Sequence, residues 1–444
     1  MGIEICTVGG YEEIGKNCTA IRVDDEVVIC DMGVHLDKFI PLTEEADDVI
    51  NIPPKVLMRE GAIPDISKIR DWRDKVIAIM PTHAHLDHVA AIPFIANRFD
   101  APIICTPYTA AVIRAILKDE RMSIPNEIKE LNVNATYKLS EKITIEFINM
   151  THSTPHTVTI AIHTPYGIVM YANDFKFDSN PTLGKKPNFK RLRELGDSGK
   201  VVALMFDSTY SLLNAKCPSE SVAKAMLKEV MLGTDSKGKV VLVTTFSSHL
   251  ARLKSIIEFG KQMNRKIVFI GRSLAKYVKA GEDIGIINFT KDVRMVKFSR
   301  ERKGVLRKID SDRGKYLIVC TGHQGEPLAV LPRMVNGEYP FDFKPEDHVI
   351  FSSSVIPTQM NIDNREILEN KIKRLGVRIF RDVHVSGHAA REDMRDMINL
   401  VRPKHVIPAH CELKMAEGVK ELALEMGYDK KNIHISSDGN RIRL

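Results

Sequence analysis

The feature that most constrains this chain is a short segment, residues 81–93, with four side chains of metal-ligand type in six positions. The segment reads PTHAHLDHVAAIP, and the four residues are His83, His85, Asp87 and His88. In an extended chain, side chains two residues apart point the same way, so the first two histidines can bind one ion. The other two residues lie at the turn into a predicted helix, where they can face a neighbouring ion. The spacing therefore favours two metal ions, and imidazole and carboxylate ligands suit zinc.

One segment cannot complete two coordination shells, so the fold must bring other strand ends to this loop. Strand-like apolar runs elsewhere are followed by residues that can supply the missing ligands: Asp31 in VICDMG, His152 in NMTHSTPH, Asp174 in MYANDF and His410 in VIPAHCE. Loops that follow neighbouring strands gather at one edge of a sheet. Taken alone, each residue also fits a turn-forming aspartate or a hydrogen-bonded histidine, and the residues by themselves leave both interpretations open.

The pattern of strands and helices changes twice along the chain. The first part is rich in short apolar or alternating strands, which predicts a β-rich sandwich with helices outside it. A middle part alternates strands with amphipathic helices, as is typical of a parallel doubly wound sheet. The tail returns to the first pattern and to more histidines. We therefore predict one domain formed by residues 1–212 and 361–444, with a second domain, residues 213–360, inserted into it.

Composition excludes several classes of protein. The apolar runs fall short of the ~18 residues that a membrane span needs, and the N-terminal residues lack the pattern of a secretory signal. The seven cysteines are scattered, as expected for reduced thiols in the cytoplasm. A net charge of +7 permits a polyanionic partner without requiring one. We predict a cytoplasmic protein that does not associate with membranes.

The order of the ligand segments resembles the metallo-β-lactamase superfamily. Asp31, the HxHxDH run, His152 and Asp174 occur in the same order as the motifs of that superfamily. Three later segments resemble motifs of the β-CASP branch, which processes nucleic acids: Asp207 in MFDSTYS, His388 in VSGHA and His410 in PAHCE. TGHQGEP (321–327) and FSSSVIP (351–357) are similar to segments of the ribonuclease J family. The resemblance covers nearly the whole chain and implies an α/β fold, a metallo-β-lactamase αββα sandwich with an inserted doubly wound β-CASP domain.

The resemblance also implies how two zinc ions are bound. One ion would be held by His83, His85, His152 and Asp174, and the other by Asp87, His88, Asp174 and His410. Asp31 would orient the loop or a bridging water. Asp207 would orient a nearby histidine, and His388 would donate to a phosphate oxygen or help to protonate the leaving 3′-oxygen.

A further expectation concerns the 5′ end of the substrate. TTFSSHLAR resembles a serine-containing loop that contacts the RNA 5′ end in ribonuclease J. Together with the later turn it would form a 5′-monophosphate pocket, made by Ser247, Ser248, Ser386, Gly387, His388 and Ala389. The two serines of the first loop equally fit an ordinary helix N-cap.

We therefore expect a zinc-dependent 5′-to-3′ exoribonuclease of the shorter, archaeal type, with or without accompanying endonuclease activity. It would prefer 5′-monophosphate ends, act on single-stranded RNA in decay and processing, and form a homodimer. The alternative is a β-CASP endoribonuclease resembling the cleavage factor of pre-mRNA 3′-end formation. The inserted domain argues against a small-molecule lactamase, and the intact ligand set argues against an inactive RNA-binding scaffold.

Overall fold

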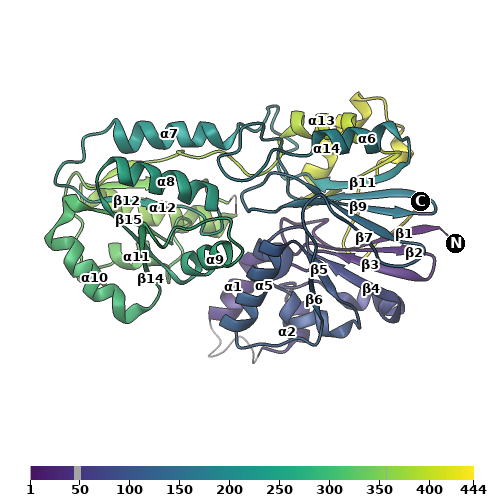
Figure 1. Ribbon diagram of the computed structural model, residues 1–444, viewed down its shortest axis with the longest axis horizontal. Coiled ribbons are helices and arrows are strands. Elements are labelled where there is room, and N and C mark those ends of the chain that lie inside the picture. Colours follow the sequence, from purple (N-terminus) through teal and green to yellow (C-terminus); the bar gives the residue numbers. More distant parts are fainter. Residues whose placement is uncertain (1, 45–51, 357) are drawn as a thin grey trace. The chain divides into compact units, whose positions relative to one another are not determined.

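The computed structural model describes residues 2–44, 52–356 and 358–444 (Figure 1). Contacts between residues divide the chain into two compact units. The first comprises Met1–Ser179, Lys185–Cys217 and Gly387–Leu444, and the second comprises Asn180–Gly184 and Pro218–Ser386. The chain thus leaves the first unit, forms nearly all of the second, and then returns.

The first unit contains two sheets. The seven-stranded sheet has the order β19-β1-β2-β3-β4-β5-β6. Its strands are β1 (Ile3–Gly9), β2 (Cys18–Val23), β3 (Glu26–Cys30), β4 (Val76–Met80), β5 (Ile103–Cys105), β6 (Ile128–Glu130) and β19 (Arg441–Arg443). The six-stranded sheet has the order β18-β11-β10-β9-β8-β7. Its strands are β7 (Thr136–Lys138), β8 (Thr144–Asn149), β9 (Val158–Thr164), β10 (Gly167–Ala172), β11 (Val201–Asp207) and β18 (His405–Ala409).

Helices cover the two outer faces of these sheets (Figure 1). On the seven-stranded side and in its connections lie α1 (Leu36–Glu44), α2 (Pro54–Arg59), α3 (Leu86–Val89), α4 (Ile92–Ile95), α5 (Pro107–Asp119) and the 3₁₀ segments η2 (Ile66–Lys75) and η3 (Ala96–Arg98). On the six-stranded side lie α6 (Phe189–Asp197), α13 (Arg391–Val401) and α14 (Leu413–Glu425), with η5 (Lys430–Asn432) before the last strand.

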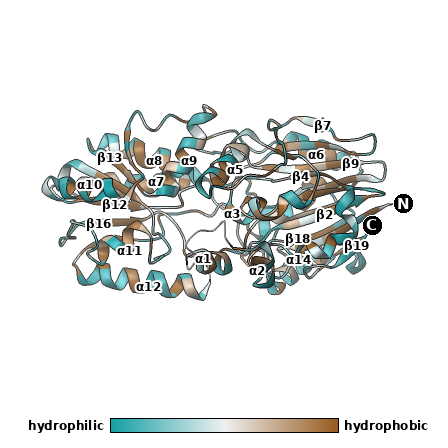
Figure 2. Cartoon of the chain, turned by 90° about the horizontal axis from the view of Figure 1, so that it is seen from below, coloured by the Kyte–Doolittle hydropathy of each residue, from teal (hydrophilic) through white to brown (hydrophobic). Residues whose placement is uncertain are grey.

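Two apolar clusters hold these layers together. One lies between the sheets and joins residues such as Ile21 and Val28 of the first sheet to Phe147 and Ile160 of the second. The other joins the six-stranded sheet to its helices, and includes Leu192, Met394 and Val419 with strand residues. Central strands such as β1, β10 and β11 therefore bury both of their faces, which accounts for their largely apolar sequences. The predicted αββα sandwich is confirmed, and the hydrophobic residues follow the sheets in Figure 2.

The second unit contains one sheet of six strands in the order β14-β13-β15-β12-β16-β17, all parallel. The strands are β12 (Val241–Thr244), β13 (Lys266–Ile270), β14 (Val293–Val296), β15 (Tyr316–Cys320), β16 (His348–Phe351) and β17 (Arg378–Phe380). The connections contain α7 (Glu220–Leu232), α8 (Leu250–Gln262), α9 (Arg272–Asp283), α10 (Ser299–Ser311), η4 (Arg313–Lys315), α11 (Val330–Val335) and α12 (Gln359–Arg374).

The parallel order confirms the predicted doubly wound sheet. The sequence pattern places the return to the first domain at residue 361. In the structure, the second unit extends to Ser386. Most of α12 and all of β17 follow residue 361 and belong to the second unit, where β17 pairs with β16 in the parallel sheet. A single helix followed by a three-residue strand carries no sign, in the sequence, of which sheet it joins.

The described residues contain no helix that is both long and apolar enough to cross a membrane. All seven cysteines are free thiols, as the scattered pattern indicates, and six of them are buried. Burial raises the pKa of Cys6 to about 11 and that of Cys411 to about 12, so both thiols stay protonated and unreactive.

A buried ion pair holds the second unit together. Arg252 on α8 is fully buried and donates from Nε and Nη2 to the two carboxylate oxygens of Glu220 on α7, at 2.6 and 2.8 Å. Its Nη1 donates to the backbone and hydroxyl oxygens of Ser352, just after β16, at 3.0 and 2.8 Å. One guanidinium thus joins two helices and a strand end.

We predict that Arg252→Ala destabilises the protein by roughly 3–5 kcal/mol, because it removes both guanidinium hydrogen bonds from the buried Glu220 carboxylate, which keeps His249 Nε2 at 3.3 Å. The exposed pair Lys279–Asp283 on α9 provides a control, and Lys279→Ala should cost less than about 0.5 kcal/mol. Urea midpoints followed by circular dichroism compare the two variants. Equal midpoints would contradict this role of the buried pair.

Candidate metal centre

The site lies where several strands of the first unit end. Residues 81–85 follow β4, His152 follows β8, and Asp174 follows β10. Strands β10, β11 and β18 run parallel, so Asp207, the last residue of β11, and His410, directly after β18, come to the same edge. The structure thus gathers ligand-type residues from five segments that are far apart in the sequence.

Left-handed backbone turns aim three of these side chains. Asp31, Asp174 and His410 have φ angles of 60°, 43° and 54°, each directly or one residue after a strand. This conformation costs about 1–2 kcal/mol for most residues, and aspartate tolerates it better than most. Each strand therefore turns sharply at its end, so that the side chain projects into the site rather than along the sheet.

A first cluster is formed by His83, His85, His152 and Asp174. The His85 Nδ1 atom lies 3.1 Å from Nε2 of His83 and 3.0 Å from Nε2 of His152. The Asp174 Oδ2 atom lies 3.4 Å from Nε2 of His83 and 3.3 Å from Nε2 of His152. Four ligands at zinc bonding distance in a tetrahedron are separated by about 3.4 Å. The four atoms are therefore spaced as the ligands of one tetrahedral ion.

A second cluster is formed by Asp87, His88, Asp174 and His410. Its members surround the other oxygen of Asp174, because Oδ1 lies 3.3 Å from Nε2 of His88 and 3.7 Å from Nε2 of His410. The Asp87 Oδ2 atom is 3.5 Å from Nε2 of His88 and 3.8 Å from Nε2 of His410. One carboxylate thus contributes one oxygen to each cluster.

A buried oxygen atom of Asp174 that accepts no hydrogen bond within the described part of the chain also supports a metal ion at this site. Asp174 is 1% exposed, yet its Oδ1 accepts no hydrogen bond from the described residues. A buried carboxylate oxygen without a donor is costly unless a cation compensates it. The donor set of nitrogen and oxygen atoms is the one that zinc takes in hydrolases.

Protonation states in the site also suit metal binding. Burial lowers the pKa of His83, His85 and His152, so these imidazoles stay neutral and keep a lone pair for an ion. Burial alone would also lower the pKa of His88, but three neighbouring carboxylates raise it well above its ordinary value. The field at the second cluster is therefore negative and favours a cation.

The Asp31 carboxylate contacts the loop and a histidine. Its Oδ1 accepts hydrogen bonds from the backbone N–H and the hydroxyl of Thr82, at 2.7 and 2.9 Å. Its Oδ2 lies 2.8 Å from Nδ1 of His88. A proton on Nδ1 leaves Nε2 free to face the second cluster. Of the two roles expected for Asp31, these contacts support orientation of the loop.

Asp207 and His388 lie beside both clusters. Asp207 Oδ2 lies 2.8 Å from Nδ1 of His388, and its Oδ1 accepts hydrogen bonds from the N–H and hydroxyl of Thr209. Burial alone would lower the pKa of His388, but the carboxylates of Asp207 and Asp174 raise it to about 9. The His388 side chain is still 24% exposed, so it can reach a substrate.

The SGHA turn, residues 386–389, contacts both the metal centre and the apolar core. The Gly387 carbonyl accepts a hydrogen bond from Nδ1 of His152 at 2.7 Å, which directs Nε2 of that histidine toward the first cluster. A Cβ at Gly387 would lie 3.0 Å from the His152 ring. Ala389 is fully buried among apolar residues. Two residues of this turn therefore support the metal centre and the core.

The serine loop lies in the second unit, with Ser386. Ser247 Oγ is 3.0 Å from Oγ of Ser273, and Ser248 is buried. Helix α8 begins at Leu250 and is capped by His249, whose ring accepts a hydrogen bond from the Arg252 N–H. The N-cap interpretation of the two serines is therefore wrong, and the 5′-phosphate pocket stays a prediction.

One residue of the site, Asn17, was missed by the sequence analysis. Its side chain is 1% exposed and lies against both His88 and His410. The amide donates to the Asp87 backbone carbonyl at 3.1 Å, and Oδ1 lies 3.0 Å from Nδ1 of His410. The amide nitrogen Nδ2 lies 2.7 Å from the same Nδ1 of His410, so both ends of the amide are near it. For Nε2 of His410 to bind an ion, its proton must lie on Nδ1, where Oδ1 would accept it. No ligand-type pattern surrounds this asparagine, so only the fold identifies it.

Comparison with known proteins agrees with this geometry. The metallo-β-lactamase superfamily model matches residues 12–203, the ribonuclease J β-CASP domain matches residues 237–371, and the Zn-dependent metallo-hydrolase RNA specificity domain matches residues 375–436. A solved structure of a protein of unknown function from Enterococcus faecalis shares the fold over the full length of both chains, with a TM-score of 0.67 at 15% identity.

Relatives of known name match this chain over nearly all of its length. Ribonuclease J of Methanocaldococcus jannaschii is 40% identical over 99% of this chain and 98% of its own. Ribonuclease J of Pyrococcus abyssi is 42% identical over 100% of this chain and 97% of its own. Ribonuclease J 1 of Streptococcus pyogenes is 32% identical over 100% of this chain and 74% of its own.

The fold and the histidine–aspartate centre define a metal-dependent hydrolase of the metallo-β-lactamase superfamily. Within that superfamily, the chain belongs to the ribonuclease J family, in the β-CASP branch.

We predict that Asn17→Ala lowers activity about 10- to 100-fold, because His410 loses the acceptor that fixes its proton. Asn17→Asp keeps an acceptor oxygen at the same place and should retain more activity. Steady-state cleavage assays and metal content of both variants check this order. If both substitutions leave activity and metal content unchanged, Asn17 does not position His410.

Proposed function

We propose that this protein hydrolyses RNA phosphodiester bonds with two zinc ions per chain, as a cytoplasmic 5′-to-3′ exonuclease in RNA decay and processing. The observation that carries the proposal is the Asp174 carboxylate, whose two oxygens face two separate ligand clusters. The match of residues 375–436 to an RNA specificity domain supports RNA as the substrate. The expected homodimer stays a prediction, which light scattering checks.

The chain's own groups would act on the substrate as follows. The ligand histidines are held in place without substrate. Asp31, Asn17 and the Gly387 carbonyl contact Nδ1 of His88, His410 and His152 respectively. Bound zinc ions would activate a water molecule and neutralise the charge of the phosphodiester. His388, held by Asp207, would donate a proton from Nε2 to a phosphate oxygen or to the leaving 3′-oxygen. The products would carry a 5′-phosphate and a 3′-hydroxyl.

The direction of degradation rests on the 5′-phosphate pocket, which we retain as part of the proposal. Within the second unit, the serine loop follows β12 and the loop from Thr321 follows β15, its parallel neighbour. Ligands of open parallel sheets bind at such carboxyl ends. The Phe246 and His323 rings of these two loops lie 4.3 Å apart, which keeps the loops adjacent. The alternative endonuclease activity needs no such pocket.

We predict close to two zinc ions per purified chain, because the two clusters provide two sets of four ligands. His410→Ala should lower the content to about one, since it removes a ligand of the second cluster alone, whereas Asp174→Asn should weaken both sites. His163→Ala removes a histidine that pairs with Glu146 outside the clusters and serves as the control. Elemental analysis measures all four proteins. Background metal in a fully active wild type would refute the zinc proposal.

We predict that Asp87→Ala lowers cleavage at least about a hundredfold while RNA binding changes little. Metal ligands stabilise the transition state, whereas lysine and arginine contacts to phosphates supply most of the affinity. Gel-shift titrations and single-turnover cleavage on the same RNA separate the two effects. Retained turnover would remove Asp87 from the catalytic site.

We predict that Ser247→Ala combined with Ser248→Ala reduces the preference for 5′-monophosphate over 5′-hydroxyl RNA by tenfold or more. Each hydrogen bond removed from the phosphate would contribute about 1.5–3 kcal/mol. Cleavage of a circular RNA, which has no end, should change little. Ser311→Ala, an exposed serine of the same unit, is the control.

Two results would favour the endonuclease instead. One is a wild type that is indifferent to the 5′ state of the RNA. The other is a double serine variant that is slowed equally on linear and circular RNA.

A further inference from the structure

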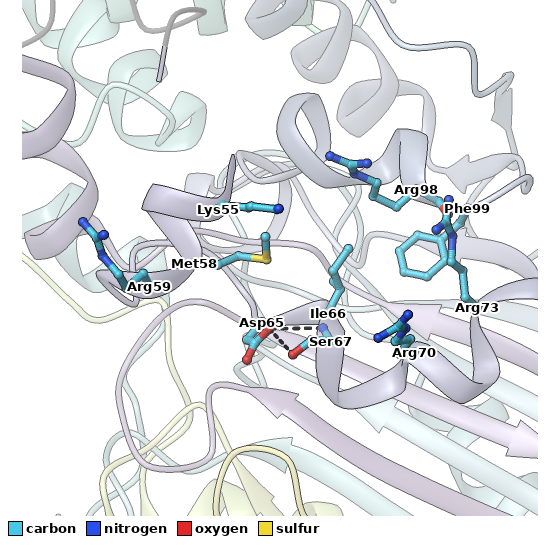
Figure 3. A pocket seen from close by; sticks show the side chains of 10 residues that line it. All are labelled: Lys55, Met58, Arg59, Asp65, Ile66, Ser67, Arg70, Arg73, Arg98 and Phe99. Atoms are coloured by element: carbon cyan, nitrogen blue, oxygen red, sulfur yellow. Dashed lines mark hydrogen bonds between the residues drawn. The ribbon is translucent and has the colours of Figure 1, made fainter. Parts of the chain in front are cut away.

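A basic pocket lies on the metallo-β-lactamase unit, outside the metal centre (Figure 3). It encloses about 440 Å³ and is formed by α2, the segment before η2, η2 itself, and the residues at η3. Its lining residues are Lys55, Met58, Arg59, Asp65, Ile66, Ser67, Arg70, Arg73, Arg98 and Phe99. We call it the α2–η2 pocket.

The charge of this pocket is strongly positive. Five cationic side chains line it against the single carboxylate of Asp65, and that carboxylate already accepts hydrogen bonds from the N–H and hydroxyl of Ser67, at 3.1 and 2.7 Å. Across residues 2–44, 52–356 and 358–444, no carboxylate forms an ion pair with Lys55, Arg70 or Arg98. Lys55, Arg70 and Arg98 therefore line one pocket without an ion-pair partner among the described residues.

The floor of the pocket is apolar and rigid. Phe99 is 3% exposed, and Ile66 and Met58 border it. The Arg73 Nε atom donates to the Arg98 carbonyl at 2.7 Å, which ties η2 to η3 across the pocket. A cationic rim over an apolar floor suits single-stranded nucleic acid, whose phosphates need cations and whose bases and riboses pack on apolar surface.

The place of the pocket separates it from catalysis. Segment η2 ends at Lys75, directly before β4, whereas the HxHxDH run begins three residues after β4 ends. Five strand residues span about 17 Å. Arg98 likewise precedes β5, which runs parallel to β4. The pocket thus adjoins the amino-terminal ends of strands whose carboxyl ends lead to the metal centre.

We propose that the α2–η2 pocket binds the phosphodiester backbone of single-stranded RNA at a distance from the bond being cut. The inference rests on the proposed function, because it assumes that RNA is the substrate. An acidic protein segment offers carboxylates, which guanidinium groups also match. The apolar residues Met58, Ile66 and Phe99 beside the cations favour a nucleic acid, whose bases and riboses pack on apolar surface. Such a second binding point would hold a long RNA between successive cuts, whereas an RNA of a few nucleotides would not reach it.

The test compares two triple variants. The pocket variant is Lys55→Gln, Arg70→Gln and Arg98→Gln. The control variant is Lys186→Gln, Arg193→Gln and Lys200→Gln, which removes the same charge from exposed cations of the same unit, none in an ion pair among the described residues and all outside the segment that matches the RNA specificity domain. Binding is measured against salt for a 5′-monophosphorylated RNA of about thirty nucleotides, a length that exceeds the usual site size of one domain. Cleavage is measured on that RNA and on a trinucleotide.

We expect the pocket variant to bind the long RNA about tenfold more weakly at low salt. Its salt slope should fall by ~0.7 for each phosphate that the protein no longer neutralises, roughly 2 in all. The control variant should keep the wild-type slope to within about 0.7, the value for one phosphate. Cleavage of the trinucleotide should be unchanged in both. Photocrosslinking of 4-thiouridine RNA to the wild type should label peptides within residues 55–73, which line the pocket and exclude the HxHxDH run, and this keeps the test valid if the triple variant does not fold.

Three outcomes would overturn the inference. The first is a pocket variant that matches the control on long RNA, which would leave an acidic protein as the alternative partner. The second is an equal loss of cleavage on the trinucleotide and the long RNA. The third is a change confined to inhibition by inorganic phosphate, which would assign the pocket to the free anion. A wild type that neither binds nor cleaves RNA would instead overturn the proposed function itself.

Discussion

The Asp174 carboxylate is the interaction on which the rest of the site depends. Its two oxygens face different histidine clusters, and it is almost fully buried in a left-handed turn after β10. A buried carboxylate among neutral and partly protonated imidazoles is stable only when cations and hydrogen bonds compensate it. Candidate ligands from four chain segments, residues 83–88, 152, 174 and 410, meet at this edge of the sandwich and supply part of that compensation.

Supporting contacts fix the ring nitrogen that each histidine presents. Asp31 contacts Nδ1 of His88, Asn17 contacts Nδ1 of His410, and the Gly387 carbonyl accepts from Nδ1 of His152. In each case the other nitrogen is left for the cluster. A similar contact orients His388, whose Nδ1 faces Asp207. The spacing of the ligand atoms therefore depends on Asp31, Asn17 and Gly387, which contact the histidines, as much as on the histidines themselves.

The insertion of the β-CASP domain has a physical consequence for the site. The chain leaves after β11 and returns before α13, so His388 and His410 reach the centre only once the first unit has closed around its own C-terminal part. Strand β18 pairs with β11, and β19 pairs with β1 at the edge of the other sheet. The C-terminal part of the chain thus completes both sheets and also supplies His410 to the second cluster.

The sequence by itself determined the fold class and most of the ligands. Apolar periodicity predicted many of the strands. The HxHxDH run indicated a metal site from six residues, because a local pattern is sufficient where ligand-type residues lie close together in the sequence. The tertiary structure alone decided what distant backbone does: the role of Asn17, the contact of Gly387 with His152, the burial of Ala389, and the inclusion of β17 in the parallel sheet. The tertiary structure also shows that His249, and neither Ser247 nor Ser248, is the N-cap of α8. Pairing between segments hundreds of residues apart leaves no periodic signal in the sequence, because it is set by how whole sheets pack.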